Sequence, residues 1–117
     1  MTENKISVNS KKDAEIFLNV FMLGILTAFH NRKITLDDAW HLLFRPGVID
    51  YLESKSISKS IIDILWLCTE LEDVESLIPD KLGEETIKLI NQLLENLDDF
   101  DGLSNHISLS VDIKQAT

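Results

Sequence analysis

The sequence predicts an all-α fold, a single compact domain of about five or six helices with a short strand in its C-terminal tail. Three observations support this prediction. The 117 residues are the size of one domain, four glycines and two prolines leave few helix breakers, and most apolar residues recur at helical spacing. We expect one domain over residues 1–117, with a core at about 10–100 and the strand within the tail, 103–117.

The first helix is expected to begin after Ser10, whose hydroxyl can cap the amide of Asp13, and to end near His30. Apolar residues cover nearly every side of it, which is typical of a central, buried helix. Gly24 in its interior indicates a close crossing with another helix.

The second helix has the clearest start in the chain. Thr35 offers a capping hydroxyl, and Asp37 and Asp38 place negative charge in the positive first turn. Trp40 lies on the apolar stripe of this helix, so we interpret it as a core residue. Pro46 ends the helix and is favourable in the first turn of a short third one.

The second half of the chain predicts further helices. Ser56 or Ser58 begins the next one, and its apolar stripe shifts sides at residues 69–72, which indicates a bend or break before Pro79. A last helix runs from about Leu82 or Glu84 to Leu97.

The tail changes to a strand pattern, because apolar and polar residues alternate over residues 107–113. A single strand cannot satisfy its own backbone groups. It pairs with residues 6–8, with another chain, or with nothing; the sequence leaves these alternatives open.

Negative charge is concentrated in one segment. The chain holds 11 basic and 20 acidic residues, a net charge of −9. Residues 60–101 hold 2 basic and 12 acidic residues, or −10, whereas the other 75 residues hold 9 and 8, or +1. This balance disfavours direct binding to nucleic acid and favours encounter with a basic protein, although a solvated helical face would have the same composition.

The candidate partner-binding residues are Trp66 and nine of the twelve acids of this segment. If residues 59–73 are one continuous helix, Trp66 lies among acids on the outer face, as an interface anchor would. Alternatively, Trp66 and Ile62 pack beneath a neighbouring helix. The full set is Asp63, Trp66, Glu70, Glu72, Asp73, Glu75, Asp80, Asp98, Asp99 and Asp101.

No pattern predicts catalysis, a cofactor or a metal ion. The three histidines are far apart and match no ligand motif, and Cys68 lies on an apolar stripe. A calcium loop centred on Gly102 would need acids where Leu97 and Ser108 stand. The apolar run 16–29 is too short to span a bilayer and lacks the flanks of a signal peptide, so we expect a cytoplasmic protein.

Four segments resemble a family of short acidic bacterial proteins of an uncharacterised domain type: LGIL at 23–26, ITLDDA at 34–39, LFRP at 43–46 and ELEDVESLIP at 70–79. The resemblance covers residues 17–82. Some members look like immunity proteins of contact-dependent growth inhibition (CDI) systems.

The resemblance implies a noncatalytic protein that binds the cognate toxin domain as a monomer in a 1:1 complex. Such toxins are often basic RNases or DNases acting on tRNA or other nucleic acids. We expect an RNase acting on tRNA, whose basic active-site cleft the acidic surface would cover. The competing interpretation is a helical adaptor or regulator that binds a DNA-binding or other basic protein, or that uses its tail strand for β-augmentation.

Overall fold

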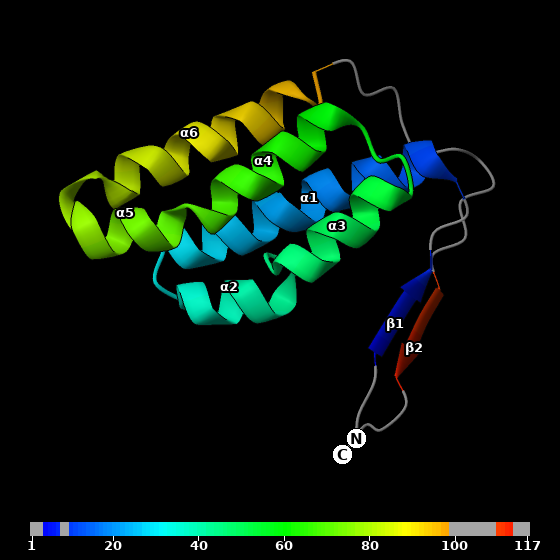
Figure 1. Cartoon of the computed structure of the whole chain (residues 1–117), viewed down its shortest axis with the longest axis horizontal. Helices are drawn as coiled ribbons and strands as arrows, with labels where there is room; N and C mark the ends of the chain where they lie inside the picture. The colour runs from blue at the N-terminus through cyan, green and yellow to red at the C-terminus, as the bar shows by residue number, and fades with distance from the viewer. Residues whose placement is uncertain (1–3, 8–9, 99–109, 114–117) are drawn as a thin grey trace.

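Helices dominate the computed structural model, which describes residues 4–7, 10–98 and 110–113 (Figure 1). Within these ranges the chain forms six α-helices, one 3-10 turn and two strands, and the predicted all-α fold is confirmed. In chain order the elements are β1 (Asn4–Ser7), α1 (Lys11–His30), α2 (Leu36–Leu42), α3 (Pro46–Ser54), α4 (Lys59–Thr69), α5 (Leu71–Leu77), η1 (Pro79–Lys81), α6 (Leu82–Glu95) and β2 (Ser110–Ile113).

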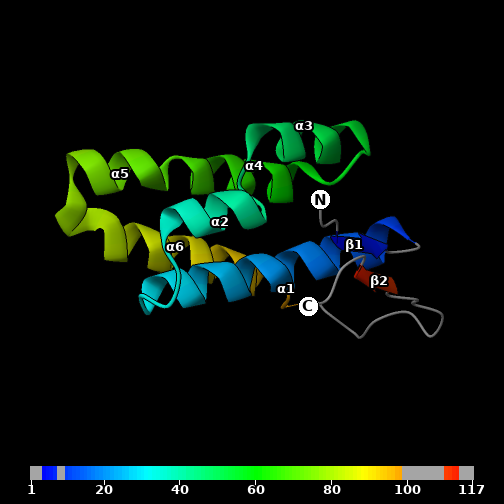
Figure 2. The same ribbon diagram turned by 90° about the horizontal axis from the view of Figure 1, so that it is seen from below.

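The helices pack around α1 and α4. Figures 1 and 2 show α4 and α5 running one after the other alongside α6, which returns antiparallel to them after η1. Helix α1 packs against α6, α2 and α4, and α3 packs against α4. Helices α4 and α5 thus lie beside α6, and α2 comes close to the junction of α4 with α5 although it precedes that junction by many residues.

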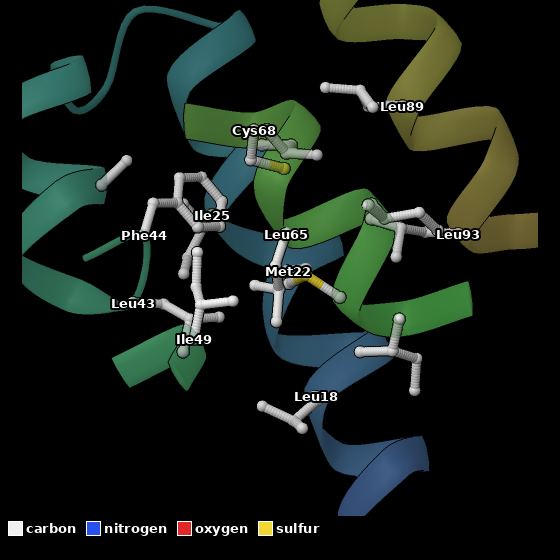
Figure 3. Close-up of a cluster of buried hydrophobic side chains, with 14 of the residues drawn as sticks. Leu18, Met22, Ile25, Leu43, Phe44, Ile49, Leu65, Cys68, Leu89 and Leu93 are labelled. Atoms are coloured by element: carbon white, nitrogen blue, oxygen red, sulfur yellow. The ribbon is translucent and has the colours of Figure 1, made fainter. Parts of the chain in front are cut away.

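A continuous apolar core fills the space between these helices (Figure 3). Met22 of α1, Ile49 of α3 and Leu65 of α4 are completely inaccessible to solvent. Full burial of each such side chain stabilises the fold by about 1.5–3 kcal/mol relative to an exposed one. The other fully inaccessible apolar residues are Leu26, Ala39 and Leu93.

The predicted helix starts depend on local capping, and the structure confirms them. Ser10 Oγ accepts a hydrogen bond of 3.1 Å from the amide of Asp13. At α2, Thr35 Oγ1 accepts from the amide of Asp38 at 3.0 Å, and Asp38 Oδ2 accepts from the amide of Thr35 at 2.9 Å. The hydrogen bond from the backbone of Thr35, and then the one from its side chain, lower the pKa of Asp38.

Helix α4 begins after Ser58, one of the two predicted starts, but the Ser58 side chain makes no capping hydrogen bond. The amide of Ser58 donates to Glu15 Oε1 of α1 at 2.6 Å. Helix α4 ends at Thr69 and α5 begins at Leu71, which confirms the predicted break. The helix pair α1–α4 thus shares a charge-assisted hydrogen bond between residues distant in sequence.

The predicted tail strand pairs within the same chain. Strand β2 is antiparallel to β1, with Val111 opposite Ile6 and Ser110 opposite Ser7. Figure 1 shows this two-stranded ribbon away from the helices. Of the residues in the predicted pairing, Val8 and 107–109 lie outside the described ranges.

Helix α1 is buried on one side only, which corrects the expectation of a helix enclosed all round. Val20 is 54% exposed, and a Cβ built on Gly24 would meet nothing within 4 Å. The expected close helix crossing at Gly24 is therefore wrong. This side of α1 instead faces an apolar hollow of about 420 Å³. The hollow is lined from α1 by Phe17, Val20, Phe21, Gly24, Ile25 and Ala28, and from outside α1 by Ile34 and Leu42. By length and mean hydropathy, 1.3, α1 has the properties of a membrane-crossing helix, although it packs against three other helices.

Replacing Gly24 by Ala is expected to raise the free energy of unfolding by about 0.5–1 kcal/mol, because alanine restricts the unfolded chain and favours helix. The open space around Gly24 accommodates the added methyl group. Urea denaturation of the Gly24→Ala variant beside the wild type measures this change. A loss of stability would show that another surface packs closely on Gly24 in solution.

Candidate functional site

A hollow of about 460 Å³ lies between α2 and the junction of α4 with α5. The carboxylates of Asp37, Glu72 and Glu75 and the indole of Trp40 share its surface. We call it the acidic hollow. Its complete lining is Leu36, Asp37, Trp40, Phe44, Cys68, Thr69, Glu72 and Glu75.

Helical spacing places the polar groups of the acidic hollow. Asp37 and Trp40 are three residues apart on α2, and Glu72 and Glu75 are three apart on α5, so each pair shares one face of its helix. The end of α4 at Thr69 allows α5 to take its own direction. The hollow therefore depends on the break between the two helices as well as on their residues.

Trp40 is 41% exposed, so the interpretation of Trp40 as a core residue is wrong. Ala39 and Leu43 are the buried positions of α2. At about 100° per residue, Trp40 projects some 60° to one side of Leu43, and it reaches only the edge of the core. Its ring meets the ring of His41 edge-on, with 5.1 Å between centroids.

Trp66 packs against the apolar core and is only partly exposed. Ile62, one turn earlier, is 3% exposed. Ile62 is therefore a core residue, and Trp66 packs against the core while it remains partly exposed. Asp63 lies on the exposed side of α4, where its Oδ2 is 3.7 Å from Lys59 Nζ.

Ion pairing leaves the charge of the acidic segment uneven. Its two lysines form ion pairs with glutamates of α6. Lys81 Nζ lies 3.5 Å from Glu84 Oε2, and Lys88 Nζ lies 3.1 Å from Glu85 Oε1. Among residues 10–98, no ion pair within 4 Å involves Glu70, Glu72, Asp73, Glu75 or Asp80. The uncompensated negative charge is therefore concentrated on α5 and its flanks, beside Trp40.

The structure gathers only part of the predicted set. Glu72 and Glu75 lie in the acidic hollow, while Glu70, Asp73 and Asp80 are exposed close to them in sequence. Asp98 follows the C-terminal end of α6, which Figure 1 shows at the other end of the molecule from α5. Asp99 and Asp101 lie outside the described residues.

Sequence reasoning missed Asp37 and Trp40. Asp37 had a sufficient local explanation as a first-turn acid at the positive end of α2. The spacing of Asp37, Trp40 and His41 could have indicated the site, because it places acidic and aromatic side chains within about one turn of the same helix.

The chemistry of the hollow favours holding a cation. Burial raises the pKa of the Cys68 thiol to about 12, so this thiol is not an activated nucleophile. Within residues 10–98, no cluster of three His, Cys, Asp or Glu side chains has the geometry to hold a metal ion. Three exposed carboxylates beside an indole suit a lysine or arginine side chain of a partner, because charge attraction and cation–π contact add.

A family model described as a protein of unknown function, DUF3969, matches residues 9–111. No curated protein matches the chain. No solved structure matches it either.

Proposed function

The chain belongs to the DUF3969 family of proteins of unknown function, and we propose that it is a noncatalytic immunity protein that neutralises a basic toxin domain. In this proposal the toxin belongs to a CDI system and is a nuclease, an RNase acting on tRNA. The immunity protein acts in the cytoplasm as a monomer in a 1:1 complex.

The observation that carries this proposal is the group of uncompensated carboxylates on α5, beside exposed Trp40. A nuclease holds its substrate phosphates with lysine and arginine side chains. Carboxylates such as Glu72 and Glu75 can occupy these phosphate positions, while Trp40 contributes apolar contact area. Long-range attraction between the two charged surfaces also accelerates their association.

The first test is inhibition of the protein encoded directly upstream. Its C-terminal domain is purified, and its nuclease activity on tRNA is measured with and without an equimolar amount of this protein. Loss of activity is expected. A toxin domain that retains full activity would contradict the pairing, and an upstream gene for a DNA-binding regulator would favour the adaptor interpretation instead.

The second test locates the surface by charge reversal. The double substitution Glu72→Lys/Glu75→Lys is expected to weaken binding to the toxin domain about 100-fold or more, and to reduce its dependence on salt, because attraction becomes repulsion. Isothermal titration calorimetry at two salt concentrations measures both effects.

Glu95→Lys/Asp98→Lys is the matched control, with the same spacing and change in net charge at the far end of α6. A tenfold or smaller effect is expected for it. An equal loss of binding in both variants would mean that net charge alone drives association, and a larger loss in the control would move the interface to the Asp98 end.

A further inference from the structure

Trp40 is shared by two hollows of the surface. One is the acidic hollow, and the other, of about 440 Å³, lies between the end of α2 and α3. The second hollow is lined by Trp40, Arg45, Pro46, Gly47, Val48 and Tyr51, and we call it the aromatic hollow.

The lining of the aromatic hollow is mainly apolar. Tyr51 is 60% exposed and Trp40 is 41% exposed, and the ring of Pro46 lies on the same lining. Aromatic side chains with an apolar body and a polar edge are those most enriched at protein interfaces. Trp40 and Tyr51 come from different helices, and together with Pro46 they form an apolar surface on which one bulky apolar side chain can pack.

The charges on the two sides of Trp40 have opposite signs. Asp37, Glu72 and Glu75 lie on the acidic side, whereas Arg45 is the charged residue that lines the aromatic hollow. Lys55 adds to the positive side, with its Nζ 5.5 Å from the centroid of the Tyr51 ring. A ligand that crosses Trp40 is therefore favoured with its basic group over α5 and its apolar group over α3.

We propose that the two hollows form one binding strip for an extended segment of the partner protein, in which a bulky apolar residue lies two positions from a lysine or arginine. The apolar side chain lies between Trp40 and Tyr51. The cationic side chain passes over the indole of Trp40 to Asp37, Glu72 and Glu75.

The geometry of an extended chain suits this arrangement. Side chains at positions i and i+2 point to the same side and stand about 7 Å apart, so they can lie on either side of one indole ring. An extended backbone also leaves its own amide and carbonyl groups accessible to water over a surface built from two short helices. This inference rests on the proposed function only in taking the ligand to be part of a protein.

The binding strip is tested by selecting peptide ligands, without using any toxin. A displayed library of random 12-residue peptides is panned against the wild-type chain, and the enriched peptide is synthesised with Arg or Lys and with Ala at its basic position. The expected enriched pattern is a bulky apolar residue two positions from Arg or Lys. Binding of the synthetic peptides is measured by fluorescence anisotropy.

Trp40→Ala and Tyr51→Ala are each expected to weaken the peptide about tenfold or more, and Leu77→Ala, at a 77% exposed position outside the strip, is expected to leave it unchanged. On the wild type the basic peptide binds about tenfold or more tightly than its Ala version. On Glu72→Gln/Glu75→Gln this ratio falls to about threefold or less, because only Asp37 and the indole of Trp40 still attract the basic side chain. Circular dichroism confirms that the variants are folded, as exposed positions lead us to expect.

Enriched peptides without the apolar and basic pair would overturn the inference, as would no enrichment at all, or binding that persists in both aromatic variants. The outcome is separate from that of the nuclease assay. If the chain selects the expected peptide but inhibits no toxin, the binding strip is supported and the immunity function is contradicted. If it inhibits the toxin but selects no such peptide, the immunity function is supported and the binding strip is contradicted.

Discussion

Leu65→Ala is expected to lower the free energy of unfolding by about 2–5 kcal/mol. The side chain is 0% exposed in α4 and lies among residues from α1, α3 and α6 (Figure 3). Its truncation removes apolar contacts and leaves a cavity that rigid neighbouring helices fill only in part. Against a total stability of about 5–15 kcal/mol for a typical domain, this loss is large.

Urea denaturation followed by circular dichroism measures the effect. The midpoint should fall while the slope with urea stays the same, because the change is in stability and the exposed area is similar. Leu77→Ala is the matched control, since the same atoms are removed from a side chain that is 77% exposed. It should change stability by about 0.5 kcal/mol or less. Equal losses at both positions would contradict the core described above.

Cys68 is expected to resist thiol reagents in the folded protein and to react fully in guanidinium chloride. The thiol is 2% exposed, and burial raises its pKa to about 12. At pH 8 its thiolate fraction is then about 10⁻⁴, against roughly a quarter for an ordinary thiol with a pKa near 8.5. Reactivity should therefore fall roughly 10³-fold before the barrier of burial is counted.

The labelling rate with a coloured disulfide reagent checks this expectation, with free cysteine as the reference. If labelling occurs through unfolding, Leu65→Ala should accelerate it about thirtyfold or more, because 2 kcal/mol corresponds to that factor. Leu77→Ala should leave the rate unchanged. A wild-type rate close to that of free cysteine would show that the wall of the acidic hollow opens around Cys68.

The helices were predictable to the extent that their signals are local. The caps at Ser10 and Thr35, the proline at the start of α3, and the break between α4 and α5 follow from residues within four positions of one another. Such hydrogen bonds and steric limits act in the same way whatever surrounds the helix. The hydrogen bond from Ser58 to Glu15 is different, because its two groups meet only when α1 and α4 pack.

The candidate site was predictable only in its charge. The acidic residues of 60–101 are visible in the amino-acid sequence, and so is their excess over the two lysines. Which of them remain uncompensated depends on Lys81, the last residue of η1, and on Lys88 in α6, because these two lysines lie beside Glu84 and Glu85. The Trp40 surface could not be predicted, because exposure depends on which neighbours a helix has on each side.

The two tryptophans show where the amino-acid sequence is sufficient and where it is not. Period and capping specify a helical chain with an acidic second half, since these properties belong to neighbouring residues. They do not specify how wide the buried side of each helix is. Helix α4 packs against α1, α3, α5 and α6, and its Trp66 is only partly exposed, whereas Trp40 on the short α2 is exposed beside Glu72 and Glu75. Burial is set by contacts between distant segments, so packing alone made Trp40, and not Trp66, the aromatic residue of the acidic surface.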